Sequence, residues 1–376
     1  MKNKVCCIFN YAPHYRIPIF KKLEEEVDCD FYFGDYVDGN IKKIEYNKLS
    51  NFKREIRNIK LPLMHFKWQK EVIKLCFNKK YNHFILTGDT SYLSTLVILI
   101  INRILGKKSY LWMHGLKSEP NLKSKILNYP FFHLANYFFL YGQYSKNILV
   151  KEGFKEDKIK VIYNSLNYEY QKNLRLNLVS SNIYSNYFKN NNKTIIYIGR
   201  IQKVKRIDLL IEAIWILKQS NIDINLVIVG SDNEGIKLED LVIKKGIQNQ
   251  VWFYGGSYNE QINAELIFNA DLCVSPGNIG LTSIHSMTYG TPCISHNDFT
   301  KQMPEFEIIE PNKTGNFFKS NDLLDLTKKI KEWFELNIER EVIRKDCYQK
   351  VDQFYNPNYQ VEIIKNTILN ESFVDS

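Results

Sequence analysis

Residues 275–294, SPGNIGLTSIHSMTYGTPCI, hold the pattern from which we infer the fold: a strand end, a glycine-rich loop and a helix. The apolar run DLCVS ends at Ser275, the loop covers 276–280, and helical character continues to Gly290. Glycine lets backbone approach a ligand closely, and the amides and dipole of a helix N-terminus attract phosphate. We expect Thr282 to cap this helix, with His285 about one turn inside it.

The length and composition suit a globular protein of two domains. The chain has 376 residues, of which 44% are hydrophobic and 24% charged. The longest apolar run, LVILII at 96–101, is followed by Asn102 and Arg103 and is much shorter than the ~20 residues that cross a bilayer. The N-terminal MKNKVCCIFNY has a brief apolar stretch without a small-residue cleavage site, so we expect no signal peptide.

Neither the cysteines nor the acidic pairs indicate a metal site. The seven cysteines are scattered, without a Cys-x-x-Cys pair, which predicts a cytoplasmic protein with reduced thiols and no structural zinc. Asp28 and Asp30 have the spacing of some metal-binding carboxylate pairs. They begin an expected strand and stand far from its carboxyl end, so we favour a protein that binds no metal.

The net charge of +10 is unevenly distributed. Residues 1–190 hold 31 Lys and Arg against 16 Asp and Glu, whereas residues 191–376 hold 20 against 25. A basic first half indicates an anionic partner, which is a nucleic acid, a membrane surface or a phosphorylated substrate. A solvated lysine-rich surface explains the same composition without any partner.

In the first half, short β-branched and aromatic runs alternate with amphipathic segments, as a parallel α/β architecture requires. The expected strands are VCCIF, CDFYF, HFILTG, SYLWMHG, NYFFLYG and KVIYNS, and the helices include 16–26 and 90–105. The stretch 173–193 is polar, rich in Asn and Ser, and without periodicity. We therefore expect the interdomain linker there.

The second half repeats this alternation. Its expected strands are TIIYIGR, NLVIVG, QVWFYG and DLCVSPG, and its helices 207–219, 236–245 and 259–269. The sequence thus predicts Rossmann-like domains at 1–185 and 186–355, with a C-terminal helix in 356–376 that returns toward the first domain. Ligands of two such domains bind at the carboxyl ends of the strands, in the cleft between them.

A second motif, YIGRIQKVKRIDLLIEA at 197–213, places two cations at a strand end. The strand ends at Gly199, Arg200 follows, and Lys205 stands five residues later, just before a helix. Arginine offers a planar fork to phosphate oxygens, and lysine a mobile point charge. The pair suits a diphosphate, although two solvated surface cations can have the same spacing.

Together these motifs produce a family resemblance. The Gly-Arg pair with its lysine, a strand ending in VIVG, the segment FYGG, and GL followed by GTP occur in the order seen in glycosyltransferase family 4. Over roughly residues 194–318, ending at EIIEPNKTGNFF, the chain resembles these retaining, sugar-nucleotide-dependent enzymes of the GT-B fold. In the first half, APHYRIPIFKKL and LWMHG resemble the acceptor-side loop and the cleft histidine of that family.

The resemblance implies roles for the matching residues. Arg200 and Lys205 match the pair that holds the donor diphosphate, and His114 matches a histidine beside the donor sugar, so these three are the expected catalytic residues. The other expected donor contacts are Gly199, Gly256, Asn278, Gly280, Leu281, Thr282, His285 and Glu307. Glu305 is an alternative to Glu307, and either carboxylate touches the donor sugar or pairs with a nearby cation.

The chain departs from the family at two positions. Family members usually have two glutamates eight residues apart, the second of which binds the nucleotide ribose; Gly277 and His285 stand there instead. The implied reaction needs no carboxylate nucleophile, because the acceptor hydroxyl attacks from the side on which the diphosphate departs. The protein supplies positioning and charge stabilisation. We therefore expect His285 to be a substitute donor contact and not a base.

The expected acceptor-binding residues lie in the first half. His14, Tyr15 and Arg16 follow the first strand, and either face the acceptor or cap and pack the helix that they enter. Asp89 either orients an acceptor hydroxyl or caps the helix that begins near Thr90.

Aromatic residues fill the segment 129–141, which is core by default. Some of them, together with Lys123 and Lys125, are candidates for a membrane-facing surface. Such a surface suits a lipid-linked acceptor, whereas a basic acceptor domain also suits soluble acidic glycans.

The sequence thus predicts a cytoplasmic glycosyltransferase at the inner face of the membrane, without a metal or other cofactor. It transfers a hexose-type sugar, with retention, from a nucleotide-diphosphate-sugar to a lipid-diphosphate-linked oligosaccharide in capsule, O-antigen or lipopolysaccharide assembly, by family analogy. One alternative is a catalytically inactive GT-B protein that binds a nucleotide sugar. Another is a basic nucleic-acid-binding protein, for which we find no recognised motif.

Overall fold

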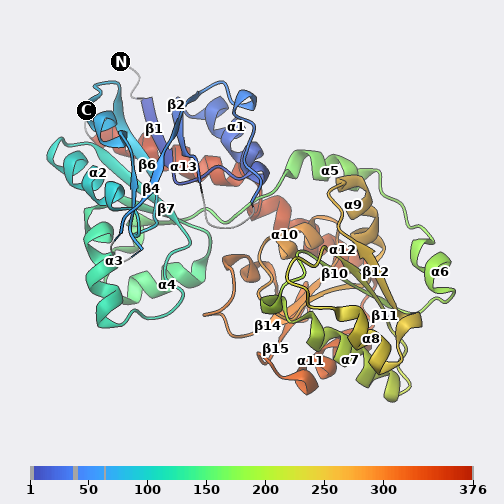
Figure 1. Cartoon of the computed structure of the whole chain (residues 1–376). Helices are drawn as coiled ribbons and strands as arrows, with labels where there is room; N and C mark the ends of the chain where they lie inside the picture. Colours follow the sequence, from blue (N-terminus) through green and yellow to red (C-terminus); the bar gives the residue numbers. More distant parts are fainter. Residues whose placement is uncertain (1–3, 37–40, 63–64, 375–376) are drawn as a thin grey trace. The chain divides into compact units, whose positions relative to one another are not determined.

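The chain forms two compact units. The structure, a computed structural model, describes residues 4–36, 41–62 and 65–374. The first unit comprises Met1–Asn167 and Asn356–Ser376, and the second comprises Tyr168–Tyr355 (Figure 1). Each is a Rossmann-like α/β domain built on a parallel sheet, as the sequence predicts, and each is described by itself.

A seven-stranded parallel sheet forms the centre of the first unit, in the order β3-β2-β1-β6-β7-β8-β9. Because helices cover both faces, its central strands are buried apolar runs and do not alternate with polar residues. Its strands are β1 (Lys4–Phe9), β2 (Cys29–Gly34), β3 (Phe52–Ile56), β6 (Tyr81–Thr87), β7 (Lys108–Met113), β8 (Tyr137–Leu140) and β9 (Ile159–Val161). A separate antiparallel pair consists of β4 (Asn58–Lys60) and β5 (Lys67–Gln69).

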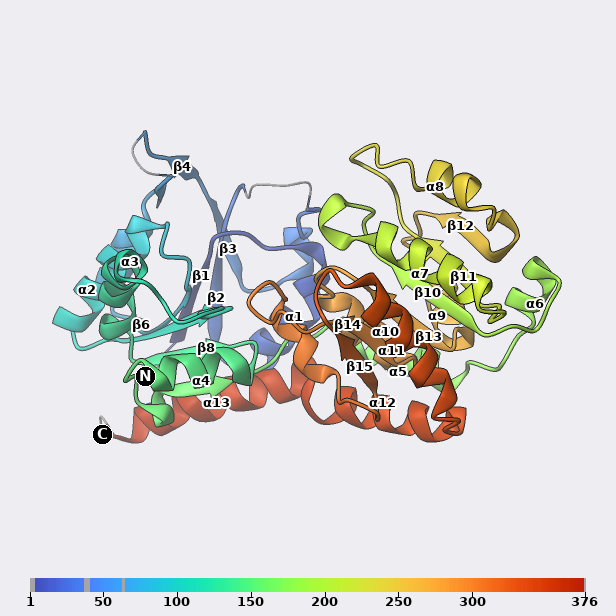
Figure 2. The same ribbon diagram turned by 90° about the horizontal axis from the view of Figure 1, so that it is seen from below.

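Two helical layers enclose this sheet. One core contains side chains of α1 (Ile17–Glu26) and α13 (Pro357–Val374). The other contains side chains of η3 (Val72–Phe77), α2 (Leu93–Ile104), α3 (Leu122–Leu134) and α4 (Gln143–Lys151). The remaining short helices are η1 (His14–Arg16), η2 (Tyr46–Lys48) and η4 (Glu156–Lys158). The C-terminal helix α13 thus belongs to the first unit (Figure 2), where Nζ of Lys365 lies 3.1 Å from Oε2 of Glu26 on α1.

The second unit contains a six-stranded parallel sheet in the order β12-β11-β10-β13-β14-β15. Its strands are β10 (Thr194–Ile198), β11 (Asn225–Val229), β12 (Val251–Gly255), β13 (Leu272–Ser275), β14 (Cys293–His296) and β15 (Gly315–Phe318). The strand order reverses beside β10, because β11 and β13 flank it. In open α/β sheets such a reversal places a ligand crevice outside the carboxyl ends of the strands.

Helices connect these strands and complete the second unit. They are η5 (Lys203–Lys205), α7 (Ile207–Gln219), α8 (Leu238–Lys245), η6 (Gln248–Gln250), α9 (Glu260–Asn269), α10 (Leu281–Thr288), η7 (Pro304–Ile308), α11 (Leu323–Glu335) and α12 (Arg340–Phe354). No helix in the part of the chain that the structure describes combines the length and hydropathy of a membrane span.

The predicted linker at 173–193 is wrong in part, and so is the boundary at 185/186. The stretch contains the end of α5 (Tyr168–Leu176) and all of α6 (Ile183–Phe188), and both helices pack on α9. Tyr184 is buried and donates to the carbonyl oxygen of Leu266 at 2.6 Å. A few apolar side chains therefore tie this polar stretch to the second unit, which begins at Tyr168.

Candidate functional site

The backbone after β10, at Gly199, packs closely against the backbone after β11, at Gly230. A Cβ atom on Gly230 would lie 2.0 Å from the carbonyl oxygen of Gly199, so only glycine fits at Gly230. Arg200 comes next, and its carbonyl oxygen accepts a hydrogen bond from Tyr197 at 2.8 Å. Its side chain is exposed, and the guanidinium makes no hydrogen bond or ion pair with any described residue. Arg200 therefore offers its full set of donors to a ligand.

Lys205 is held against the glycine-rich loop. Its Nζ donates to the carbonyl oxygen and to Oδ1 of Asn278, at 2.6 and 2.7 Å. Burial and then the charge of Arg200 lower the pKa of Lys205 to about 8, while Glu305 acts in the opposite direction. Lys205 is thus mostly charged at pH 7, and an added anion would favour that charge.

Gly277 lies against the backbone of the turn that carries Lys205. Its amide donates to the carbonyl oxygen of Lys205 at 2.8 Å. A Cβ atom at Gly277 would lie 2.1 Å from the carbonyl oxygen of Val204 and 2.6 Å from the Cα of Lys205. No side chain fits there without moving the turn that carries Lys205, and a glutamate is excluded for the same reason.

The N-terminus of α10 is capped by Gly280, which has φ of +54° and ψ of −146°, a conformation that favours glycine. The capping role predicted for Thr282 is wrong, because its hydroxyl donates to the carbonyl oxygen of Ile198, 3.0 Å away at the end of β10. No side chain caps α10. Gly280 and Leu281 thus begin a helix whose first amides no capping side chain occupies.

His285 bonds a carboxylate that comes from a neighbouring helix. Its Nε2 lies 2.9 Å from Oε1 of Glu260, in the first turn of α9. The same oxygen accepts from the hydroxyl of Tyr289 at 2.7 Å and from Nε2 of Gln171 at 2.8 Å. Burial alone would raise the pKa of Glu260, but these bonds, led by that of His285, lower it to about 2.

The remaining donor candidates differ in exposure. Gly256 is exposed, and a Cβ atom there would lie 2.2 Å from Oγ of Ser231, which follows β11. Glu307 is half-buried in η7, whereas Glu305 of the same short helix is buried. Of the two glutamates, Glu305 is the one whose charge acts on Lys205.

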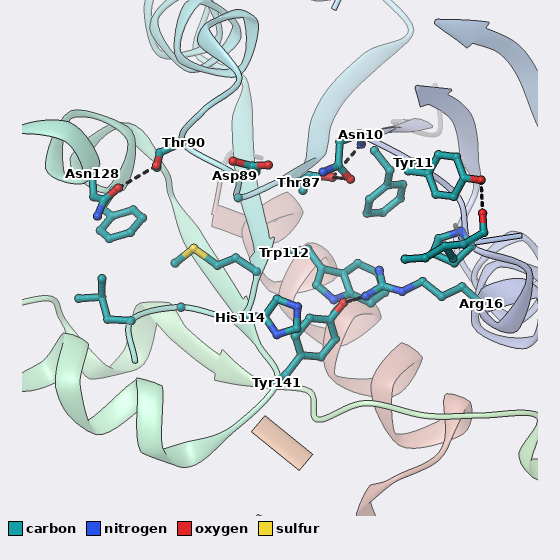
Figure 3. Close-up of a pocket in the computed structure, with 18 of the residues that line it drawn as sticks. Asn10, Tyr11, Arg16, Thr87, Asp89, Thr90, Trp112, His114, Asn128 and Tyr141 are labelled. Carbon is teal, nitrogen blue, oxygen red and sulfur yellow. Dashed lines mark hydrogen bonds between the residues drawn. The ribbon is translucent and has the colours of Figure 1, made fainter. Parts of the chain in front are cut away.

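A cavity of about 470 Å³ opens at the carboxyl ends of the strands in the first unit (Figure 3). Its wall includes the last residues of β1, β6 and β7, residues that follow these strands and β8, and one side of α3. Among them are Asn10, Tyr15, Arg16, Thr87, Asp89, Thr90, Trp112, His114, Asn128, Phe132 and Tyr141. Aromatic faces and polar edges are combined here, as a sugar ring with apolar C–H faces and a rim of hydroxyls requires.

Arg16 covers two aromatic rings in this cavity. Its guanidinium carbon lies 5.7 Å from the ring centre of Trp112 and 5.3 Å from that of Tyr141, and Nη2 bonds the Tyr141 hydroxyl (Figure 3). The buried Nε1 of Trp112 has no hydrogen-bond partner within the described residues. A buried donor without a partner is uncommon and suits a site that a ligand completes.

His114 follows β7 at the edge of the cavity, with its ring centre 4.8 Å from that of Tyr141. The pKa of His114 is lowered, first by burial of the imidazole among neighbouring atoms and then by the cations Arg16 and Lys117. Part of the residue nevertheless remains exposed to solvent. His114 is therefore a neutral imidazole at pH 7, which can donate one hydrogen bond and accept another.

The expected acceptor residues divide between the cavity and the surface. Tyr15, Arg16 and Asp89 line the cavity, whereas His14 is exposed and bonds the carbonyl oxygen of Lys42 at 3.2 Å. The alternative role of Asp89 as a helix cap is wrong. It accepts from the amide and hydroxyl of Ser91 at 3.0 and 2.7 Å, in a turn that precedes α2.

The Asp28 and Asp30 pair is occupied by lysines. Asp30 is buried, and its carboxylate lies within 3.3 Å of the amines of Lys4, Lys53 and Lys80. Three cations around one carboxylate leave no role for a metal there. The described residues contain no group of three or more His, Cys, Asp or Glu side chains that could hold a metal ion.

Comparison with known proteins now adds the family context. Residues 181–350 match the model of the family described as glycosyl transferases group 1. An uncharacterized glycosyltransferase of Methanocaldococcus jannaschii is 33% identical over 144 residues, which are 37% of this chain and 36% of that protein. An uncharacterized 41.2 kDa protein in the cps region of Klebsiella pneumoniae is 26% identical over 231 residues, or 59% of each chain. The matches thus span less than two thirds of these curated relatives.

The structural similarity extends beyond residues 181–350. The crystal structure of Anabaena Alr3699/HepE in complex with UDP has a TM-score of 0.72 and 18% identity, and the match covers 98% of this chain and 100% of that one. Both units are included in this match, so the whole chain has the GT-B fold.

The sequence did not single out several of the residues that the structure brings to these edges. Asn10 and Tyr141 follow β1 and β8, and Thr87 is the last residue of β6, so the rule that ligands meet carboxyl strand ends could have indicated them. Glu260 could have been noticed as an acidic residue in a first helical turn. Nothing in the sequence pairs Glu260 with His285, because the pair forms between separate helices.

Proposed function

We propose that this protein is a retaining glycosyltransferase of family 4 that transfers a sugar from a nucleotide-diphosphate-sugar to a hydroxyl of an oligosaccharide. The observation that carries the proposal is that Lys205 bonds the loop before α10, while Arg200 follows β10, whose last carbonyl bonds Thr282 of that helix. Two cations and an uncapped helix N-terminus meet at the carboxyl end of a sheet, where α/β domains bind nucleotides.

The proposed reaction needs charge stabilisation more than it needs a nucleophile. The acceptor oxygen forms a bond to the anomeric carbon while the bond to the diphosphate oxygen breaks on the same face, and the acceptor proton passes to the departing diphosphate. Negative charge develops on that diphosphate. We propose that Arg200 and Lys205 neutralise this charge, and that the reaction therefore needs no metal ion.

The cavity in the first unit is the proposed acceptor site. Asp89 and Asn10 offer acceptors for sugar hydroxyls, while Trp112 and Tyr141 offer aromatic faces. The neutral imidazole of His114 is a proposed contact of the donor sugar. Similarity to the Klebsiella pneumoniae protein of the cps region supports a role in the assembly of a surface polysaccharide.

We further propose a cytoplasmic protein that works at the anionic inner surface of the membrane on a lipid-diphosphate-linked acceptor. All seven cysteines are buried free thiols, which suits a reducing compartment. The first unit holds 29 Lys and Arg against 18 Asp and Glu, which suits an anionic surface.

A thermal-shift panel of UDP-, GDP- and dTDP-sugars followed by a turnover assay tests the proposal. The cognate donor at 100 times its Kd should stabilise the second unit by about 2.7 kcal/mol. UDP is the first nucleotide to test, because the structure of Alr3699/HepE contains it. Release of the nucleoside diphosphate, by slow hydrolysis or by transfer, supports the enzyme. Tight donor binding without any turnover would instead favour the inactive nucleotide-sugar-binding protein.

A further inference from the structure

Helix α3 carries an apolar outward face that no part of the described chain covers. Leu122 is 74% exposed, Ile126 is 68% exposed and Leu127 is 43% exposed. Leu122 and Ile126 are four residues apart and therefore adjacent on the helix. Pro130 and His133 continue the exposed face toward the C-terminus of α3. A surface helix normally turns polar residues outward, so this face indicates a docking surface.

The outward face is also grooved. A shallow groove of about 430 Å³ follows it and is lined by Lys125, Ile126, Tyr129, Pro130 and His133. Its lining is apolar apart from the lysine amine, the tyrosine hydroxyl and the imidazole. Hydrocarbon or an apolar side chain fits such a groove better than a charged group does.

The opposite side of the same helix lines the cavity proposed for the acceptor. Asn128 and Phe132 of α3 contribute to that wall. Asn128 accepts a hydrogen bond from Thr90 at 2.8 Å, which ties the helix to the loop after β6. A partner on the outward face of α3 would therefore lie one helix diameter, about 10 Å, from the cavity.

The segment of sequence that carries this face is basic. Residues 90–152 contain eight Lys and Arg against two acidic residues, Glu119 and Glu152. Glu152 is paired with Lys125 at 2.5 Å. Lys123 is exposed and makes no ion pair with any described residue. Helix α3 itself has no acidic residue.

We propose that the outward face of α3 docks on an anionic lipid surface, with Leu122 and Ile126 at the boundary between headgroups and acyl chains. Apolar side chains flanked by lysines are the combination that such a surface binds. A second copy of this chain is a poorer occupant, since a two-fold contact would place Lys123 and its basic surroundings against their own copies. The inference rests on the proposed function, because it names the surface by which the acceptor site reaches a lipid-linked substrate.

Co-sedimentation of the full chain with vesicles tests the proposal. Vesicles of phosphatidylcholine with one third phosphatidylglycerol should bind the wild type, and pure phosphatidylcholine should bind it much less. The double variant Leu122→Ser/Ile126→Ser should lower the partition coefficient by roughly tenfold or more. Lys123→Glu should lower it several-fold and make it less sensitive to salt.

The matched control is Leu324→Ser on α11 in the second unit, where the leucine is 71% exposed. It should leave vesicle binding unchanged. Full vesicle binding by the Leu122→Ser/Ile126→Ser variant would overturn the proposal. The proposal would also be overturned if the wild type were a dimer, the variant a monomer, and vesicle binding the same for both, because α3 would then form a self-interface.

The same variants separate this inference from the proposed function. Each should retain the wild-type melting temperature and the wild-type stabilisation by UDP, because α3 lies in the first unit. Loss of vesicle binding with intact UDP binding supports the docking surface. Failure of every nucleotide to bind, with vesicle binding as expected, contradicts the proposed function and leaves the docking surface standing.

Discussion

The imidazole of His285 donates from Nε2 to Oε1 of Glu260 across 2.9 Å, between the helices α10 and α9. Glu260 stays ionised because its pKa is lowered to about 2, and a carboxylate anion only accepts hydrogen bonds. Nε2 must therefore carry a proton, which leaves Nδ1 as the second ring nitrogen. Nδ1 has no hydrogen-bond partner among the described residues. A ring nitrogen without a partner thus lies at the position where the sequence resemblance places a ribose-binding glutamate.

Removing either member of this pair should weaken donor binding more than it slows turnover. His285→Ala should mainly raise the KM for the donor, as the loss of a uniform binding contact does. Glu260→Gln should act in the same direction, because the amide no longer determines which imidazole nitrogen carries the proton. The two effects should be less than additive in the double variant. Initial rates over a range of donor concentrations measure this, and a loss of kcat at unchanged KM would show that His285 has another role.

The same carboxylate should contribute stability with a defined pH dependence. The folded pKa of Glu260, about 2, lies below its ordinary value of 4.5, so its stabilisation is complete above that value and lost as pH falls toward 2. Glu260→Gln should therefore lower the free energy of unfolding at pH 7 by up to on the order of 3 kcal/mol. Urea denaturation at pH 7 and at pH 4 should show a smaller difference at pH 4. Glu239→Gln, at an exposed position in the first turn of α8, is the matched control and should show neither effect.

The two cations at the sheet edge should govern the chemical step. Arg200→Ala and Lys205→Ala should each lower kcat by roughly 10²-fold or more, because each removes charge that faces the departing diphosphate. Lys203→Ala is the control, since Lys203 is an exposed lysine of the same short helix η5. Near-normal turnover in both folded variants would remove Arg200 and Lys205 from the catalytic site.

Gly277 should tolerate no side chain. The Cβ of Gly277→Ala would press on the backbone at Val204 and Lys205, which should cost about 1–3 kcal/mol of stability and weaken UDP binding by displacing the amine of Lys205. Gly235→Ala is the comparison, because a Cβ there meets nothing within 4 Å although φ is +66°. It should lose some stability through backbone strain and keep its UDP affinity. Calorimetry with UDP separates the two cases, and unchanged UDP binding by Gly277→Ala would refute the steric explanation.

Much of this architecture was predictable, because strands buried on both faces read as apolar runs and strand ends coincide with glycine. The motif from Gly199 to Lys205 lies at a carboxyl strand end in the structure, as the sequence predicts. The start of the second unit at Tyr168 was not predictable from composition, because α5 and α6 are polar stretches held by a few buried side chains such as Tyr184. The bond between His285 and Glu260, and the greater burial of Glu305 than of Glu307, depend on packing between distant segments. Local sequence patterns do not predict contacts between segments that are far apart in the chain.

Donor binding should depend on pH through Lys205. Its pKa in the free protein is lowered to about 8, and a bound diphosphate favours the charged amine and raises that pKa. Between the free and the bound pKa, UDP binding must take up a proton, so the Kd should rise up to about tenfold for each pH unit above 8. Calorimetry at pH 8.5 in two buffers of different ionisation enthalpy measures the proton uptake directly. Lys205→Arg stays charged throughout and should bind UDP without this dependence. A wild-type Kd that is constant from pH 7.5 to 9.5 would show that the amine of Lys205 does not contact the diphosphate.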